Sequence, residues 1–278
     1  MAGDDLPLVE SVNNLEAEDP YESVAPLFKL ATDWLTRSAT ANVALELAVH
    51  DLRWRGDWRL SICRTFQDIA GVSVVMPQGD WFLEAHGPSA AVFLANAAVV
   101  HGRRPVTLTT SEDGSALVRP FLLDQGGINR EYKLRTLRCT RPPADREGRW
   151  ATANDLPGLV EYENQIDAAE KRLIDTAWER LIARQELAVV DDASGSVVAS
   201  IRRYGPAPLF AGIADLFVAP NASPSGIAAR LTGFVVRELL ATREAVYVFV
   251  DESDAATLSF YDSLGFEQVG TCYRADLK

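Results

Sequence analysis

The sequence predicts a mixed α/β protein, because stretches with helical periodicity alternate with short strand-like runs along the whole chain. Two observations carry this prediction. In the first half, two amphipathic stretches come before a series of short strands and a helix. In the second half, three strands are followed by a helix, a strand, a helix and a last strand. With 278 residues, one large domain or two modest domains are both open.

The elements expected in the first half begin with helical patterns from Tyr21 and over 41–52. Strands are expected at 60–63, 72–75, 81–84, 106–110 and 131–139. One further helix, which starts after Pro88, is expected over 89–100. In the second half the patterns predict helices at 156–162, 166–184, 225–241 and 255–264. They predict strands at 187–190, 196–202, 209–218, 245–250 and 266–273.

Three segments divide the chain. Residues 1–20 are acidic and lack periodicity, so we expect a loose arm. Residues 21–140 form an N-terminal α/β domain, and 149–278 form a second domain. Between them, Arg141–Arg149 (RPPADREGR) is proline-rich, charged and almost without apolar residues, which is typical of a linker.

The composition excludes several classes of protein. The chain has 27 Lys and Arg against 39 Asp and Glu, a formal net charge of −12, and nucleic-acid binding needs the opposite balance. The acidic excess is compatible with a cationic substrate, although solubility explains it equally well. The three cysteines are far apart and form no CxxC motif, which excludes a disulfide scaffold and a zinc knuckle.

Other patterns narrow the location and the chemistry. The longest apolar run, Ala90–Val100, contains Asn96 and is too short to span a bilayer. The acidic N-terminus lacks the basic region of a signal peptide, so we expect a cytoplasmic protein without a membrane partner. All three histidines lie in the first half, which excludes a His-containing triad or an HExxH zinc site in the second half.

One turn in the second half points to an anionic ligand. The strand that ends at Val218 runs into a short turn with Ser225 and Gly226, and a helix begins at once. Free N–H groups and the helix dipole at such a turn favour a phosphate or pyrophosphate, and Gly226 lets the chain approach it closely. An ordinary capped helix is the alternative reading of this stretch.

Two motifs in the correct spacing resemble those of the GCN5-related N-acetyltransferase (GNAT) superfamily. Ser223-Pro-Ser-Gly-Ile-Ala228 is similar to the family's R/Q-x-x-G-x-G/A turn, and Phe260-Tyr-Asp-Ser-Leu-Gly-Phe266 to its L-Y-x-x-x-G-F segment. Ile213–Val218 resembles the fourth strand of that fold. The resemblance covers about 150–278 and implies a mixed, mostly antiparallel sheet flanked by helices.

The resemblance implies that coenzyme A binds here as acyl-CoA and that no metal is needed. The pantetheine amides would pair with the backbone of Leu216 and Val218, and the pyrophosphate with N–H groups of the turn. The implied cofactor-binding residues are Leu216, Phe217, Val218, Ser223, Ser225, Gly226, Ile227, Ala228 and Asp254. Ser223 stands where Arg or Gln is usual, so one contact to the pyrophosphate would be missing. Asp254 stands where Asn is usual, which leaves a degenerate, non-catalytic copy as the alternative.

The resemblance also implies catalytic roles. Tyr261 would protonate the departing thiolate, the alternative being a tyrosine that only packs against the cofactor. Asp215, on the fourth strand, would accept the amine proton directly or through water, the alternative being a solvated or salt-bridged residue. Glu161 and Glu163 would border the acceptor cleft and attract a cationic amine, the alternative being a solvated helix face.

The first half carries no such motif, but Trp81–Thr110 loosely follows the GNAT core order without its glycine turn. This is similar to tandem GNAT proteins with a degenerate N-terminal copy, which would shape the acceptor pocket. The expected function is transfer of an acetyl or longer acyl group from acyl-CoA to an amine of a small molecule or peptide. The alternative is a catalytically inactive acyl-CoA-binding or peptide-binding protein of the same fold.

Overall fold

The computed structural model forms two compact units. Unit 1 comprises Met1–Arg135 and Gly270–Lys278, and unit 2 comprises Thr136–Val269. The structure describes residues 8–13, 20–37, 42–52, 58–65, 68–99, 104–124, 127–164, 177–220, 222 and 226–278.

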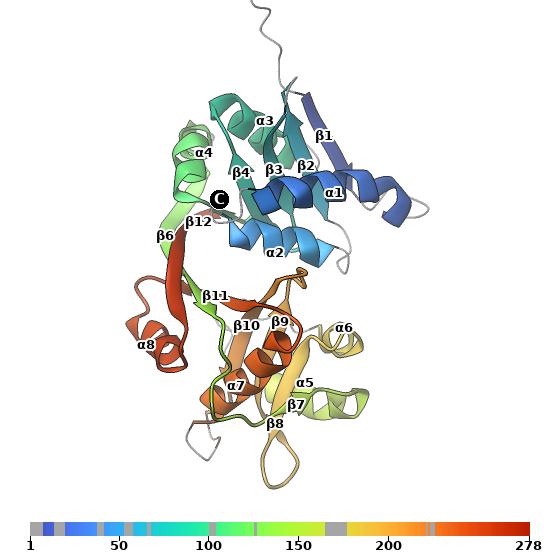
Figure 1. Ribbon diagram of the computed structural model, residues 1–278, viewed down its shortest axis with the longest axis vertical. Helices are drawn as coiled ribbons and strands as arrows, with labels where there is room; N and C mark the ends of the chain where they lie inside the picture. Colours follow the sequence, from blue (N-terminus) through green and yellow to red (C-terminus); the bar gives the residue numbers. More distant parts are fainter. Residues whose placement is uncertain are drawn as a thin grey trace, which may run out of the picture. The chain divides into compact units, whose positions relative to one another are not determined.

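The elements that begin in unit 1 alternate as the sequence predicts (Figure 1). They are β1 (Leu8–Asn13), α1 (Pro20–Arg37), α2 (Val43–Asp51), β2 (Arg59–Arg64), β3 (Ile69–Val75), β4 (Asp80–Ala85), α3 (Pro88–Val99), β5 (Thr107–Thr110), α4 (Glu112–Asp124) and β6 (Ile128–Cys139).

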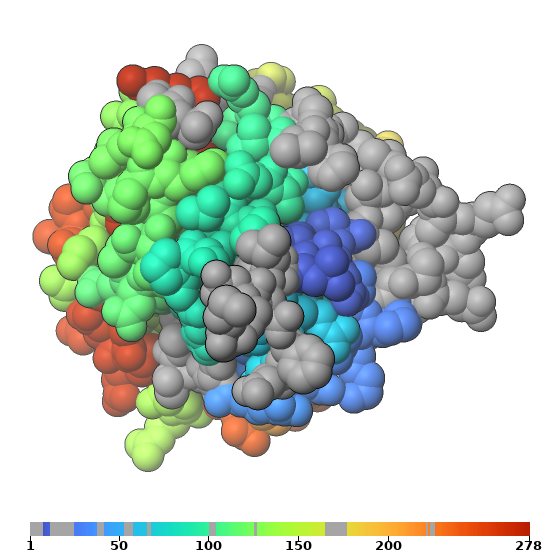
Figure 2. Space-filling model, turned by 90° about the horizontal axis from the view of Figure 1, so that it is seen from above, coloured from blue at the N-terminus to red at the C-terminus, as the bar shows by residue number. Residues whose placement is uncertain are grey.

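The sheet of unit 1 has the strand order β1-β2-β3-β4-β5-β12-β6. The pairs from β1 to β4 are antiparallel, whereas β4 and β5 are parallel. Helices α1 and α2 cover one face and bury Trp34 and Leu45 there. Helices α3 and α4 bury Leu94 and Val118 on the other face, and Figure 2 shows these two helices, in teal and green, side by side.

Unit 2 repeats this series of elements. It contains β7 (Arg149–Trp150), a 3-10 turn η2 (Ala153–Asp155), α5 (Leu156–Glu163), α6 (Trp178–Ala183), β8 (Leu187–Asp191), β9 (Val197–Tyr204), β10 (Phe210–Val218), α7 (Ile227–Leu240), β11 (Ala245–Asp251), α8 (Ala255–Ser263) and β12 (Glu267–Leu277). Most of the helix expected over 166–184 lies outside the described residues, which resume at Ala177.

The sheet of unit 2 has the order β12-β6-β11-β10-β9-β8-β7, with β10 and β11 parallel and β7 to β10 antiparallel. Helix α7 covers one face, where Leu231 and Val235 pack on the sheet. Helices α5 and α6 cover the other face through Leu159 and Leu181. Both units confirm the predicted mixed, mostly antiparallel sheet flanked by helices.

Each unit completes its core with a strand from the other half of the sequence. Tyr273 and Ala275, near the end of β12, are buried in the core of unit 1 between α3, α4 and the sheet. Leu137 and Cys139, at the end of β6, are buried in the core of unit 2. In each unit the strand from the other half lies between the unit's own last two strands, as β5-β12-β6 in unit 1 and β11-β6-β12 in unit 2. Each unit is therefore one copy of a repeated fold.

The division of the chain differs from the expected one at both ends of the first domain. Leu8–Asn13, within the expected acidic arm, forms β1 and pairs along its whole length with β2. The expected linker packs against α7, where the Glu147 N–H donates to the Arg230 carbonyl at 3.1 Å and Gly233 lies directly under the Asp145 carbonyl. The division between units falls inside β6, between Arg135 and Thr136.

Gly233 provides a test of this packing. A Cβ atom at Gly233 would collide with the Asp145 carbonyl oxygen, so we expect Gly233→Ala to lower the free energy of unfolding by about 1–3 kcal/mol. Gly158→Ala is the matched control, because that helical glycine has only Val197 nearby, at 4.0 Å. The control should stabilise by up to about 1 kcal/mol in urea unfolding. Equal effects of the two variants would contradict the close approach.

Candidate functional site

The two parallel strands at the centre of unit 2 separate after three paired residues. Phe210 to Gly212 pair with Ala245 to Tyr247. Beyond Gly212 and Tyr247 the described ladder has no further pair between these strands, although β10 continues to Val218 and β11 to Asp251. The result is a splay that leaves one edge of β10 open.

A bulge in β10 accompanies the splay. The register of β10 on β9 shifts between Ala214 and Phe217. Asp215, inside the bulge, has a φ of 55°, a left-handed conformation that aspartate tolerates better than most residues. The extra residue bends β10, and the Asp215 side chain does not follow the alternation of side chains between the two faces of the sheet.

The backbone after the bulge alternates between the two edges of β10. The Tyr162 hydroxyl donates to the Phe217 carbonyl at 2.9 Å, and the Ala219 N–H donates to the Val198 carbonyl at 2.8 Å, both on the β9 side. Alternation places the N–H and C=O groups of Leu216 and Val218 on the open edge. Of the three strand residues expected to bind the cofactor, Phe217 therefore turns its backbone away from the splay.

The turn after β10 ends at Gly226, which caps α7 with a φ of 83°. Ser223 and Ser225, both expected to bind the cofactor, lie outside the described residues. Ile227 is buried in the first turn of the helix, and Ala228 is half-buried beside it. The N–H groups at the start of α7 have no partner within the helix, which makes this end of the helix suitable for an anion.

Arg230 adds a cation to this turn that sequence reasoning missed. A Cβ atom on Gly226 would lie 3.4 Å from the Arg230 Nη1, so the guanidinium is next to the glycine. Its Nε donates to Glu147 at 2.6 Å. A long side chain in the first turn points toward the helix N-terminus, and that rule could have identified Arg230 from its spacing to Gly226.

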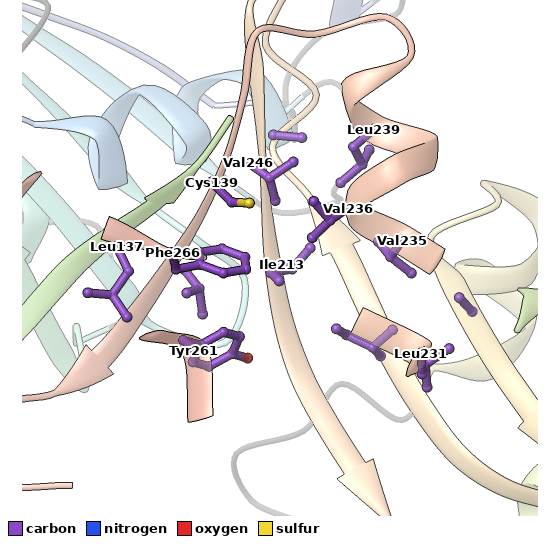
Figure 3. Packing of buried hydrophobic residues seen from close by; sticks show 14 of the residues in the cluster. Leu137, Cys139, Ile213, Leu231, Val235, Val236, Leu239, Val246, Tyr261 and Phe266 are labelled. Carbon is purple, nitrogen blue, oxygen red and sulfur yellow. The ribbon is translucent and has the colours of Figure 1, made fainter. Parts of the chain in front are cut away.

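Tyr261, on α8, is almost completely buried at 4 % exposure. Its ring makes edge contacts with Phe260 at 5.0 Å and Phe266 at 5.1 Å between centroids. Figure 3 shows its hydroxyl turned toward the strand that carries Ile213. Burial, and secondly the charge of Asp215, raise the pKa of Tyr261 well above its usual value, so the phenol stays protonated at neutral pH.

Asp215 forms a short ion pair with Arg202 on β9. The Arg202 Nε lies 2.6 Å from the Asp215 Oδ2, and the side chains are only 14% and 13% exposed. The Arg202 guanidinium stacks on the Tyr204 ring at 5.2 Å. Sequence reasoning missed both residues, although the two-residue period of a strand puts Arg202 and Tyr204 on one face.

The other predicted residues have structural contacts. Asp254 is the N-cap of α8 and accepts a hydrogen bond from the Thr257 N–H at 3.0 Å. Glu163 accepts a hydrogen bond from the Trp178 indole at 3.1 Å and so joins α5 to α6. Glu161 is exposed on α5. The cofactor role of Asp254 and the acceptor roles of Glu161 and Glu163 stay predictions.

Comparisons with known proteins place this site in a family. Residues 160–276 match the model of the acetyltransferase (GNAT) domain. A Drosophila protein of solved structure is 13% identical, with a TM-score of 0.69 and 98% of each chain covered. A GNAT-family acetyltransferase from Colwellia psychrerythraea is 12% identical, with a TM-score of 0.59 and coverage of 98% of this chain and 100% of its own.

A tandem GNAT protein from the clavulanic acid biosynthesis pathway is 14% identical, with a TM-score of 0.59 and coverage of 97% of this chain and 98% of its own. No curated protein matches. The described part of the chain contains no helix long and apolar enough to cross a membrane. Residues 160–276, in the second unit, thus match the GNAT domain, and the first unit is a second copy of the same fold, as in the tandem GNAT protein to which the chain is similar.

The first copy lacks both features of the site. In unit 1, β4 and β5 pair along all four residues of β5, and the register of β3 on β4 has no shift. Only His86 and Gly87 separate β4 from α3. Two residues cannot form the longer turn that precedes α7, which agrees with a degenerate N-terminal copy.

The Asp254 cap gives a prediction that needs no ligand. Asp254→Ala should lower the free energy of unfolding by about 1 kcal/mol at neutral pH, and Asp254→Asn by less, because an amide oxygen still caps the helix. Hydrogen bonds from Thr257 lower the pKa of Asp254. The charge therefore stabilises the fold above the unfolded pKa of about 3.9, and this stabilisation is lost as pH falls through the folded pKa.

The measurement is urea unfolding at several pH values. The difference in free energy of unfolding between the parent and Asp254→Asn should disappear as the pH falls. The difference between the parent and Asp254→Ala should persist to lower pH. Asp254→Ala without any loss at neutral pH would show that the carboxylate does not cap α8.

Proposed function

We propose that unit 2 transfers an acyl group from acyl-CoA to an amine of a small molecule or peptide by direct attack. The observation that carries the proposal is the splay of β10 and β11, together with a Tyr261 phenol close enough to Asp215 for the charge of that carboxylate to raise its pKa. The GNAT family match supports an acetyltransferase activity in general. The donor, the acceptor and the roles of single residues are our inference.

The donor side follows from the open edge of β10 and the start of α7. The pantetheine arm is an extended chain with two amides, and it can pair with Leu216 and Val218 as an added strand would. The pyrophosphate would meet the N–H groups of Gly226, Ile227 and Ala228. The Arg230 guanidinium pairs with Glu147 through Nε and lies next to Gly226 with Nη1, which supports an anionic group of acyl-CoA at this turn.

The chemistry needs one base and one acid. The amine nitrogen attacks the thioester carbonyl carbon, and its extra proton passes to Asp215, directly or through water. The carbon–sulfur bond then breaks, and the sulfur takes a proton from Tyr261. A tyrosine phenol is protonated at neutral pH, and the raised pKa of Tyr261 leaves it in the state that an acid requires. The three cysteines are buried and unbonded, which supports a reducing compartment such as the cytoplasm.

Replacement of Tyr261 tests the acid. Tyr261→Phe keeps the packing with Phe260 and Phe266 but removes the proton donor, so kcat for thiol release should fall by about 10²-fold. The KM for acyl-CoA should change little, because the ground-state contacts remain. Calorimetry with coenzyme A checks that the variant binds normally. Turnover within twofold of the parent, with product release shown not to limit the rate, would assign the acid to water or another group.

Gly226 tests the donor site. Valine at φ 83° is strained and reorients the N–H groups, so Gly226→Val should weaken coenzyme A binding at least tenfold, about 1.4 kcal/mol. Gly195→Val is the matched control. Gly195 has a φ of 84° in the β8–β9 hairpin and, like Gly226, has no backbone atom nearby that a Cβ would meet. Calorimetry that finds equal affinity for the two folded variants would remove the turn from the donor site.

A further inference from the structure

The carboxylate of Asp215 is on the least regular part of β10. The bulge gives this strand one residue more than β9 opposite it, and the left-handed φ of 55° turns the Asp215 side chain out of the alternation that its neighbours follow. The regular geometry of the sheet does not determine where the carboxylate of such a residue points. A contact from outside the bulge must therefore set where it points.

Arg202 supplies that contact, and Arg202 is itself held in place. It pairs with Ala214 across the β9–β10 ladder, one residue before Asp215, so its side chain starts on the face that Ala214 occupies. The guanidinium lies over the Tyr204 ring at 5.2 Å and donates from Nε to the Asp215 Oδ2 at 2.6 Å. With 14% and 13% exposure, solvent screens this pair little.

The Tyr204 ring has its place because Gly212 has no side chain. Tyr204 and Gly212 are opposite each other in the ladder, and a Cβ atom on Gly212 would lie 2.5 Å from the ring. Gly212 is also the last residue of β10 that pairs with β11. The contacts from Gly212 through Tyr204 and Arg202 to Asp215 thus begin where the splay opens and end at the carboxylate.

We propose that Arg202 is a positioning residue, which holds the Asp215 carboxylate at the acceptor side of the splay so that it can take the proton of the attacking amine. The inference rests on the proposed function. A guanidinium fixed by ring stacking presents Nε in one direction, which a flexible lysine cannot reproduce. Arg202 and Asp215 therefore act as a unit, and loss of either one removes the same contribution to the rate.

The experiment is a double-mutant cycle on amine-dependent thiol release. Asp215→Asn is suitable because asparagine tolerates the left-handed conformation. We expect Arg202→Gln and Asp215→Asn each to lower kcat by about 10²-fold. The double variant should lose no more than the worse single variant. Arg202→Lys should fall between the parent and Arg202→Gln, and coenzyme A affinity by calorimetry should stay within about twofold in all four.

Arg203→Gln is the matched control. Arg203 is the next residue of β9, and its guanidinium donates to the Gln185 carbonyl at 2.7 Å and the Arg184 carbonyl at 3.1 Å. Its loss weakens the same strand without touching Asp215. The losses in kcat from Arg203→Gln and Asp215→Asn should therefore multiply in the double variant. The losses from Arg202→Gln and Asp215→Asn should not multiply.

The outcomes separate the two proposals. Two results with an active parent overturn the positioning role alone. One is a folded Arg202→Gln variant whose kcat is within twofold of the parent. The other is a double variant in which the losses in kcat from Arg202→Gln and Asp215→Asn multiply. A parent that releases no thiol with any amine or acyl donor overturns the proposed function and this inference with it. If Arg202→Gln does not fold, the cycle is made with Arg202→Lys, and the same multiplicative result overturns the role.

Discussion

One additional residue in β10 determines most of what unit 2 can do. The pairing with β11 ends at Gly212, just before the bulge between Ala214 and Phe217, and the bulge sets which backbone groups face the gap. An open strand edge is normally a liability, because its N–H and C=O groups seek partners. Under the proposed function, the pantetheine amides of acyl-CoA would pair with this edge and the pyrophosphate would meet the start of α7. Unit 1 has the same series of elements, but its β4 has no shift in register and its central strands stay closed.

Buried charge in unit 2 is arranged around this gap. Tyr261 loses its tendency to ionise because aromatic and aliphatic side chains enclose it. Asp215 keeps a cation within 2.6 Å, so the negative charge near the phenol is partly balanced. The two groups belong to different elements, α8 and β10, which only the tertiary fold brings together. These different surroundings suit the two roles proposed above, proton donor for Tyr261 and proton acceptor for Asp215.

The sequence was sufficient for features that depend on local pattern. Strands β8 to β12 and helices α7 and α8 follow from alternation and helical periodicity. The Phe260–Phe266 segment indicated the GNAT domain that residues 160–276 match. Helix α4 escaped prediction because Gly114 and Pro120 interrupt it, and the Ser111 hydroxyl, which accepts from the Gly114 N–H, sets its start. Strand β1 escaped because its partner β2 is about fifty residues away in sequence. The Arg202 ion pair depends on strand register and on a bulge, neither of which periodicity reveals.

The shared strands β6 and β12 govern how the chain can be assembled and dissected. During synthesis, most of unit 1 emerges first, yet the Tyr273 and Ala275 side chains that fill its core are made only after all of unit 2. The core of unit 1 is therefore filled only once residues 270–278 have been made. A cut between Arg135 and Thr136 would leave the first fragment without Tyr273 and Ala275, and so with an unfilled core. A fragment that began at the expected domain boundary, residue 149, would keep every candidate residue of the site and still lack Leu137 and Cys139, which are buried in the core of unit 2.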